Sequence, residues 1–147
     1  MRAAYTALLR LALPLILLRL WWRGRWEPRY REAIAERFGH YRTPAKEGVV
    51  WIHAVSVGEA RAAAPLVKAL AGYPILITCT TAAGRETLEQ LYGDAILSAY
   101  FPYDYPKAVA RFLAHFRPRL AILMETEVWP NLLSACRERS VPVVLKR

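Results

Sequence analysis

The sequence predicts an α/β fold built on a Rossmann-like, doubly wound parallel sheet. Beyond Gly48, short apolar runs alternate with amphipathic stretches, which indicates strands joined by helical crossovers. The runs are continuously hydrophobic, as is typical of strands covered on both faces. With 147 residues, 55% of them hydrophobic and 22% charged, the chain is long enough for one packed domain.

The first element predicted is a helix over 5–22, apolar nearly all round and followed at once by Arg23, Gly24 and Arg25. No small-residue cleavage site follows it, which argues against a removed signal peptide. Arg10 and Arg19 interrupt the run, and an arginine at mid-bilayer costs roughly 2.5–3.5 kcal/mol. The pattern therefore favours an interfacial anchor over a spanning helix. Trp21, Trp22 and Trp26 would then lie at headgroup depth. The alternative is a helix packed on the body of its own protein.

The positive charge is concentrated in the first third of the chain. Residues 1–46 hold ten Lys or Arg against three acids, whereas 47–147 hold eleven against nine. A basic segment beside an apolar one suits an anionic membrane surface. Nucleic acid is the competing partner, but a reader of phosphate backbones would not need the flanking Leu, Ile and Trp. We therefore expect a membrane-associated helical segment over 1–46 and a Rossmann-like domain over 47–147.

A short polar helix is expected over 28–38, with Gly39 as its stop. Five strands and four helices should follow in alternation. The predicted strands are 49–55, 74–78, 95–100, 120–124 and 141–145, and the predicted helices are 59–71, 84–92, 106–116 and 129–139.

Ligands of such sheets bind beyond the carboxyl ends of the strands. The first strand runs into Ser56, Val57, Gly58 and Glu59, with the helix expected to begin at or just after the glutamate. A carboxylate at this edge, near a helix amino terminus, could serve as a general base. The alternative is that Glu59 is only an acid that favours the start of a helix.

Further polar residues follow other strands at the same edge. Glu125 and Glu127 come after the fourth strand, where acids are costly unless they serve a site. The alternative is that one of these glutamates only caps the next helix. Thr81 and Gly84 follow the second strand and could contact a substrate. The turn over 101–106 either lines a pocket or merely fixes the loop.

No cofactor or metal is expected. The sequence has no GxGxxG or Walker spacing and no metal-ligand spacing among its His and Cys residues, which argues against a nucleotide-binding oxidoreductase. Cys79 and Cys136 are predicted to be small buried hydrophobes in a reducing compartment.

Three segments, in this order and spacing, closely resemble motifs of the bacterial Kdo (3-deoxy-D-manno-oct-2-ulosonic acid) transferases. They are Ser56-Val57-Gly58-Glu59, Phe101-Pro102-Tyr103-Asp104 and the stretch from Met124 to Asn131 (METEVWPN). The apolar run and Glu36-Arg37-Phe38-Gly39 look like the family's membrane-proximal helices. The resemblance covers essentially the whole chain.

The resemblance implies the amino-terminal, acceptor-binding domain of an inverting GT-B glycosyltransferase. Such an enzyme transfers Kdo from CMP-Kdo to a lipid A precursor (lipid IVA) in lipopolysaccharide biosynthesis, at the cytoplasmic face of the inner membrane. Glu59 would match the general base and Glu125 a residue that stabilises the transition state. Ser56, Gly58, Thr81, Gly84 and Glu127 are the acceptor-binding candidates. The basic helices would meet the phosphates and acyl chains of lipid A.

The sequence departs from the family pattern in two places. Thr81-Ala82-Ala83-Gly84 replaces a frequent Thr-Pro-Thr-Gly, and the chain closes at Arg147, where the family continues into a donor-binding domain. We therefore expect a truncated or split enzyme that cannot transfer Kdo alone and that acts with a separate carboxy-terminal half if one exists. The alternative is a non-catalytic module, left by truncation, that binds lipid A or membranes.

Overall fold

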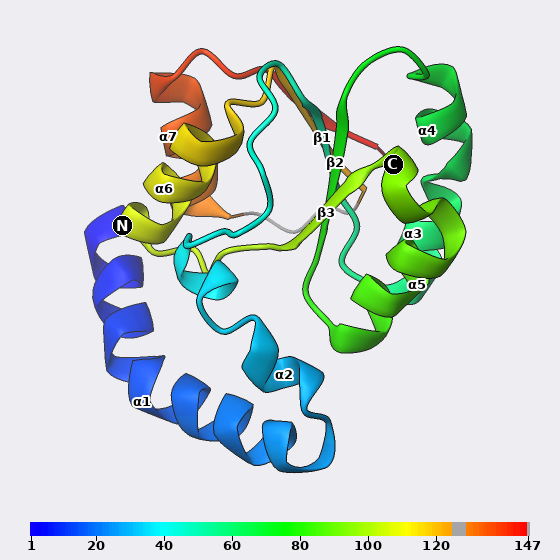
Figure 1. Cartoon of the computed structure of the whole chain (residues 1–147). Helices are drawn as coiled ribbons and strands as arrows, with labels where there is room; N and C mark the ends of the chain where they lie inside the picture. The colour runs from blue at the N-terminus through cyan, green and yellow to red at the C-terminus, as the bar shows by residue number, and fades with distance from the viewer. Residues whose placement is uncertain (125–128, 147) are drawn as a thin grey trace.

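A computed structural model describes residues 1–124 and 129–146, apart from the side chain of Glu32. Its centre is a sheet of five parallel strands in the order β3-β2-β1-β4-β5 (Figure 1). The strands are β1 (Val50–His53), β2 (Ile75–Cys79), β3 (Leu97–Tyr100), β4 (Leu120–Leu123) and β5 (Val143–Leu145). The predicted α/β fold is therefore confirmed, with strand ends that differ from the prediction by a few residues at most.

Helices cover both faces of the sheet (Figure 1). One face carries α3 (Val57–Ala62), α4 (Ala64–Ala69) and α5 (Ala82–Tyr92), and the other carries α6 (Pro106–Phe116) and α7 (Pro130–Glu138). A short 3-10 turn, η2 (Gly93–Ala95), leads into β3.

The alternation of side chains along each strand produces two separate cores. On β1, Trp51 packs with α6 and α7, whereas Val50 and Ile52 pack with the helices of the opposite face. Both sets are apolar and almost completely buried. This explains why the strands read as continuous hydrophobic runs.

Two predicted helices are each divided in the structure. The helix expected over 59–71 begins at Val57 and is split into α3 and α4, with Pro65 in the first turn of the second. Proline has no N–H and its ring clashes with the preceding turn, so Pro65 favours a break in the helix at this point. The helix expected over 28–38 is replaced by α2 (Arg29–Glu32) and a 3-10 turn, η1 (Glu36–Phe38), which Gly39 ends at φ +86° as predicted.

The η1 turn is held by the sheet, because the Glu36 carboxylate accepts hydrogen bonds from Tyr100 N at 2.8 Å and from Arg85 Nη1 at 3.0 Å. These contacts outweigh the weak intrinsic preference of so short a segment for a continuous helix. The division of the chain after residue 46 remains a prediction.

The amino-terminal helix α1 (Arg2–Trp26) contacts the rest of the molecule near both of its ends. Near its start, Thr6 exchanges hydrogen bonds with Asn131, and Tyr105 donates to the Leu9 carbonyl at 2.6 Å. Near its end, Leu20 packs with Tyr30 and Ala82. Along the intervening length, large apolar side chains remain exposed.

A buried polar network joins α1, the loop after β3 and the start of α7. The Asp104 carboxylate accepts hydrogen bonds from Asn131 N and Leu132 N at 3.0 and 2.8 Å, and so caps α7. The Asn131 side chain donates to Thr6 Oγ1 at 3.1 Å. The loop over 101–106, which the sequence left open as pocket wall or structural turn, has both roles: Asp104 caps α7, and Phe101, Pro102 and Tyr103 line the cavity described below.

Candidate functional site

The candidate site lies at the carboxyl edge of the sheet, where the strand order reverses between β1 and β4. These two strands are hydrogen-bonded neighbours, with His53 opposite Leu123 and Met124 N donating to His53 O at 3.1 Å. The crossover from β1 leads toward one face of the sheet and that from β4 toward the other. Such a switch point leaves the crevice in which open α/β sheets bind ligands.

Glu59 lies in the first turn of α3, directly beyond β1. Ser56 is the N-cap, and its hydroxyl accepts a hydrogen bond from Glu59 N at 3.3 Å. The Glu59 carboxylate accepts in return from Val55 N at 2.8 Å and from Ser56 Oγ at 2.9 Å. This reciprocal pair is a variant of the capping box, in which the carboxylate accepts from the N–H of Val55, one residue before the N-cap. The helix therefore begins two residues before the glutamate.

The two hydrogen bonds leave acceptor positions of the Glu59 carboxylate free. Glu59 is partly exposed, and each of its oxygens accepts one of these hydrogen bonds while an ionised carboxylate has about four acceptor positions. The two donors hold the side chain in one orientation, and a substrate hydroxyl could still reach a free lone pair. The geometry is therefore compatible with both roles considered for Glu59, an acid that favours the start of a helix and a general base.

The other candidates after β1 and β2 lie around the same edge. Ser56 and Gly58 are partly or fully exposed. Thr81 caps α5, its hydroxyl accepting from Gly84 N at 3.0 Å, and it also lines the cavity described below. Gly84 is buried, and a Cβ there would lie 3.3 Å from Cys79 Cβ, so glycine permits the close approach of α5 to β2. Whether these residues bind an acceptor remains a prediction.

Glu125 and Glu127 lie outside the described residues. The description of the chain stops at Met124 and resumes at Trp129.

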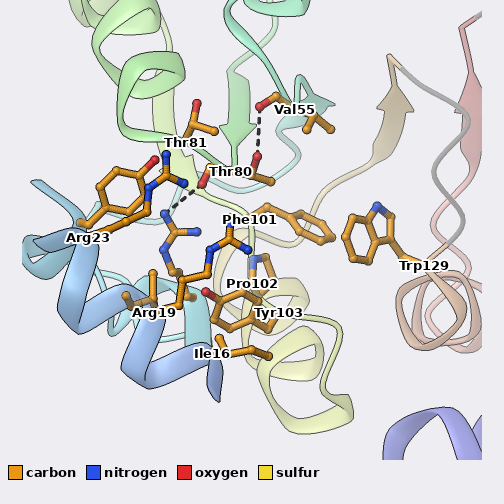
Figure 2. A pocket seen from close by; sticks show the side chains of 13 residues that line it. Ile16, Arg19, Arg23, Val55, Thr80, Thr81, Phe101, Pro102, Tyr103 and Trp129 are labelled. Atoms are coloured by element: carbon orange, nitrogen blue, oxygen red, sulfur yellow. Dashed lines mark hydrogen bonds between the residues drawn. The ribbon is translucent and has the colours of Figure 1, made fainter. Parts of the chain in front are cut away.

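A cavity that sequence reasoning missed lies between α1 and the sheet edge. It has a volume of about 370 Å³ and is bounded by the second half of α1, η1, the loops after β1, β2 and β3, and Trp129 (Figure 2). Arg19, Arg23 and Arg37 line it, and Val55 and Thr80 form part of the opposite wall. The charge count showed that the first third of the chain is basic. It did not show that several arginines of this segment would line one cavity.

Arg37 is the most buried of these arginines, only 4% exposed. Its Nη2 donates to the Thr80 carbonyl at 2.9 Å, and the guanidinium carbon lies 4.4 Å from the centroid of the Tyr100 ring. Stacking on an aromatic face favours a guanidinium cation. Its Nε has no hydrogen-bond partner among the described residues.

His53 ends β1 beneath the same edge and is 3% exposed. Its Nδ1 lies 2.8 Å from Thr78 Oγ1, which also accepts from Trp51 Nε1 at 2.8 Å. Burial lowers the pKa of His53 to about 4, because desolvation disfavours the imidazolium. The ring is therefore neutral at physiological pH.

The cysteines are free and buried, as predicted. Burial raises the pKa of Cys79 to about 12 and that of Cys136 to about 11, so both remain thiols at neutral pH. Among the side chains that the structure describes, which exclude Glu32 and residues 125–128 and 147, no group of three or more His, Cys, Asp or Glu could hold a metal ion.

Comparison with known proteins agrees with the motif resemblance. A family model described as 3-Deoxy-D-manno-octulosonic-acid transferase (kdotransferase) matches residues 32–146. The chain is 50% identical to a 3-deoxy-D-manno-octulosonic acid transferase of Bordetella pertussis, over 98% of this chain and 36% of that protein. It is 41% identical to the enzyme of the same name from Haemophilus influenzae, over 98% of this chain and 35% of the relative.

A probable mitochondrial 3-deoxy-D-manno-octulosonic acid transferase of Arabidopsis thaliana is 36% identical, over 96% of this chain and 33% of the relative. The chain thus spans about a third of the length of these curated relatives. Because the family model covers most of the chain and the identity extends from end to end, the chain belongs to the 3-deoxy-D-manno-octulosonic acid transferase family.

Proposed function

We propose that this chain is the acceptor-binding half of an inverting glycosyltransferase of GT-B architecture. It would present a lipid A precursor (lipid IVA) for transfer of Kdo from CMP-Kdo, in lipopolysaccharide biosynthesis. The donor would bind a second domain, which lies in the remaining length of the relatives or on a separate polypeptide. On this proposal these 147 residues bind the acceptor, and the chemistry needs no cofactor.

The observation that carries the proposal is the placement of Glu59. Its carboxylate lies at the switch point of the sheet, oriented by Val55 N and Ser56 Oγ and still partly open to solvent. A general base needs a fixed carboxylate within reach of the proton it removes. Glu59 would take the proton of the acceptor hydroxyl as its oxygen attacks the anomeric carbon of Kdo. Glu125 is proposed, from the motif alone, to stabilise the transition state.

The exposed face of α1 supports a membrane location for this half. Leucines and a tryptophan recur on it at intervals of three or four residues and are 59–78% exposed: Leu8, Leu11, Leu15, Leu18 and Trp22. Arg19 lies next to this stripe, whereas Arg10 projects about 120° from its middle, toward the body of the protein. The helix is long and apolar enough to cross a bilayer, but the exposed stripe and the basic residues of α1 fit an in-plane anchor on anionic lipid at the cytoplasmic face of the inner membrane.

The test of Glu59 is a chimera that joins residues 1–146 to the remaining carboxy-terminal part of the Bordetella pertussis relative. We expect the chimera to transfer Kdo from CMP-Kdo to the lipid A precursor. Glu59→Gln should lower kcat by about 10²- to 10⁴-fold, the usual contribution of general base catalysis. The amide keeps the size of the side chain and can still accept from Val55 N, so the melting temperature should change little.

Glu47→Gln is the matched control, since Glu47 precedes β1 at the opposite edge of the sheet and its side chain is 84% exposed. It should leave kcat unchanged. An active chimera in which Glu59→Gln turns over as fast as Glu47→Gln would reduce Glu59 to a helix cap. A chimera that binds the acceptor but never transfers Kdo would favour the non-catalytic lipid-binding module.

A further inference from the structure

The cavity between α1 and the sheet edge carries a concentrated positive charge. Arg19, Arg23 and Arg37 line it, and its described lining includes no acidic side chain. None of the three forms an ion pair with a carboxylate of the described residues. Positive charges gathered in a concave, partly apolar site attract an anionic ligand.

Arg37 supplies an independent sign of a ligand. The residue is only 4% exposed. Its guanidinium charge is compensated by the hydrogen bond to the Thr80 carbonyl and by the aromatic rings around it. Its Nε is buried and unpartnered among the described residues, and a buried N–H left without an acceptor costs about 1–3 kcal/mol. An anion in the cavity that Arg37 lines would offset the charge of this buried guanidinium.

The two arginines of α1 reinforce this arrangement. Arg19 and Arg23 are one turn apart, so their like charges destabilise an isolated helix. Figure 2 shows both side chains extending from α1 toward the loop that carries Thr80 and Thr81. Thr81 is the N-cap of the eleven-residue helix α5, whose amino-terminal dipole adds positive potential at the cavity wall.

We propose that Arg19, Arg23 and Arg37 bind a phosphate monoester carried by the acceptor sugar, an inference that rests on the acceptor role proposed above. A phosphate monoester has close to two negative charges and three acceptor oxygens, which suits several guanidinium groups. The cavity, at about 370 Å³, has room for a sugar ring beside the phosphate, against the apolar wall of Phe101 and Pro102.

The same cavity borders a hydrogen-bond partner of Glu59, although Glu59 itself is not among the lining residues. Val55 lines the cavity, and Val55 N donates to the Glu59 carboxylate at 2.8 Å. A phosphate held by the arginines would therefore hold the sugar on the side of the sheet edge where Glu59 lies. The three arginines are positioning residues on this account, and their effect should appear in binding rather than in the chemical step.

The test measures binding of soluble ligands to the whole chain by calorimetry, without lipid or donor. The ligands are glucosamine 1-phosphate, glucosamine and inorganic phosphate. We expect glucosamine 1-phosphate to bind most tightly, and the double variant Arg19→Gln/Arg23→Gln to raise its Kd about tenfold or more, as loss of charge-assisted hydrogen bonds predicts. Arg10→Gln/Arg25→Gln removes the same charge from the same helix, outside this cavity, and should leave the Kd within about twofold.

Arg37→Lys is the second variant, which keeps the charge but cannot reproduce the forked guanidinium. It should also weaken binding of glucosamine 1-phosphate while its circular dichroism stays that of the native chain. Equal losses in the two double variants, or equal binding of glucosamine and its phosphate, would overturn the proposal.

Vesicles of phosphatidylglycerol separate the phosphate of a sugar from that of a phospholipid. If Arg19→Gln/Arg23→Gln weakens vesicle binding and leaves glucosamine 1-phosphate binding unchanged, the arginines bind headgroups and the proposal fails. In the chimera, the same double variant should raise the KM for the phosphorylated acceptor and leave kcat unchanged. An active chimera without that rise contradicts this inference alone, whereas an inactive chimera that still binds the sugar phosphate contradicts only the proposed function.

Discussion

At the scale of single residues, Glu59 stabilises the start of a helix and is proposed to act also as a general base. Glu59 closes the capping box with Ser56, and those contacts hold its carboxylate where a substrate could reach it. Its orientation therefore costs little additional entropy, because the fold already restricts the side chain. Glu59 could serve both as a helix cap and as a general base, and the turnover rate of the Glu59→Gln variant distinguishes the two roles.

His53 makes stability depend on pH. The pKa of His53 is near 4 in the folded chain and near 6.5 when the ring is exposed. Between these two pH values the unfolded state binds a proton and the folded state does not. Stability is then complete above about pH 6.5 and falls as the pH drops toward 4, by about 3 kcal/mol in all. Urea unfolding between about pH 7 and pH 4.5 should show this loss, and His53→Gln should show a smaller one. Equal slopes in the two proteins would contradict the assignment.

At the scale of elements, the turn that follows η1 depends on glycine. Gly39 has φ +86°, and a Cβ there would lie 2.5 Å from the Ala108 carbonyl oxygen and 2.8 Å from Arg111 Cβ. The neighbouring atoms belong to α6, so the turn fits against that helix only without a side chain. The position of η1, and with it that of Arg37, follows from this contact.

We expect Gly39→Ala to lower the free energy of unfolding by about 3 kcal/mol, since it combines backbone strain with a collision against backbone atoms. Gly48→Ala is the control, because Gly48 has φ +69° but a Cβ added there would meet nothing within 4 Å. That variant should lose only about 1 kcal/mol. Urea denaturation of both proteins measures the difference, and equal losses would show that crowding by α6 does not matter.

Much of this arrangement could be predicted from the sequence. The five strands were predictable because burial on both faces leaves unbroken apolar runs, as in Val49 to Ile52. Two features were missed although local signals existed: Ser56 and Glu59 have capping-box spacing, and Pro65 marks the break between α3 and α4.

The arginine cavity could not be predicted in the same way. It depends on contacts between segments far apart in the chain, such as those of Arg37 with Thr80 and Tyr100. Charge counting located basic residues in the first third, but it could not show that one of them is buried. Burial of a cation depends on the rings that surround it, and those come from separate segments of the chain.

At the scale of the whole molecule, α1 separates an apolar outer face from a charged inner cavity. Leu15 and Leu18 are 70% and 59% exposed on the outer side, whereas Ile16 and Arg19 line the cavity on the inner side. One helix could thus contact lipid with one face and the acceptor head group with the other.

We expect Leu15→Glu/Leu18→Glu to weaken binding to phosphatidylglycerol vesicles by about tenfold or more, because each leucine contributes roughly 1.5–3 kcal/mol when buried in lipid. Flotation of vesicles with bound protein measures this. Leu91→Glu, at an exposed leucine of α5, is the control and should bind normally. The melting temperature of both variants should stay near that of the original chain, and vesicle binding that survives the double change would exclude α1 as the anchor.

The attachment of α1 near both ends has a kinetic consequence. Because Thr6 and Leu20 tie the helix to the body while the cavity opens beneath its second half, a lipid could enter the cavity head first and keep its tails in the bilayer. Encounters would then occur by lateral diffusion within one leaflet. Turnover of the assembled enzyme should accordingly follow the mole fraction of acceptor in the membrane, and diluting the vesicles in buffer at constant composition should leave the rate per bound enzyme unchanged.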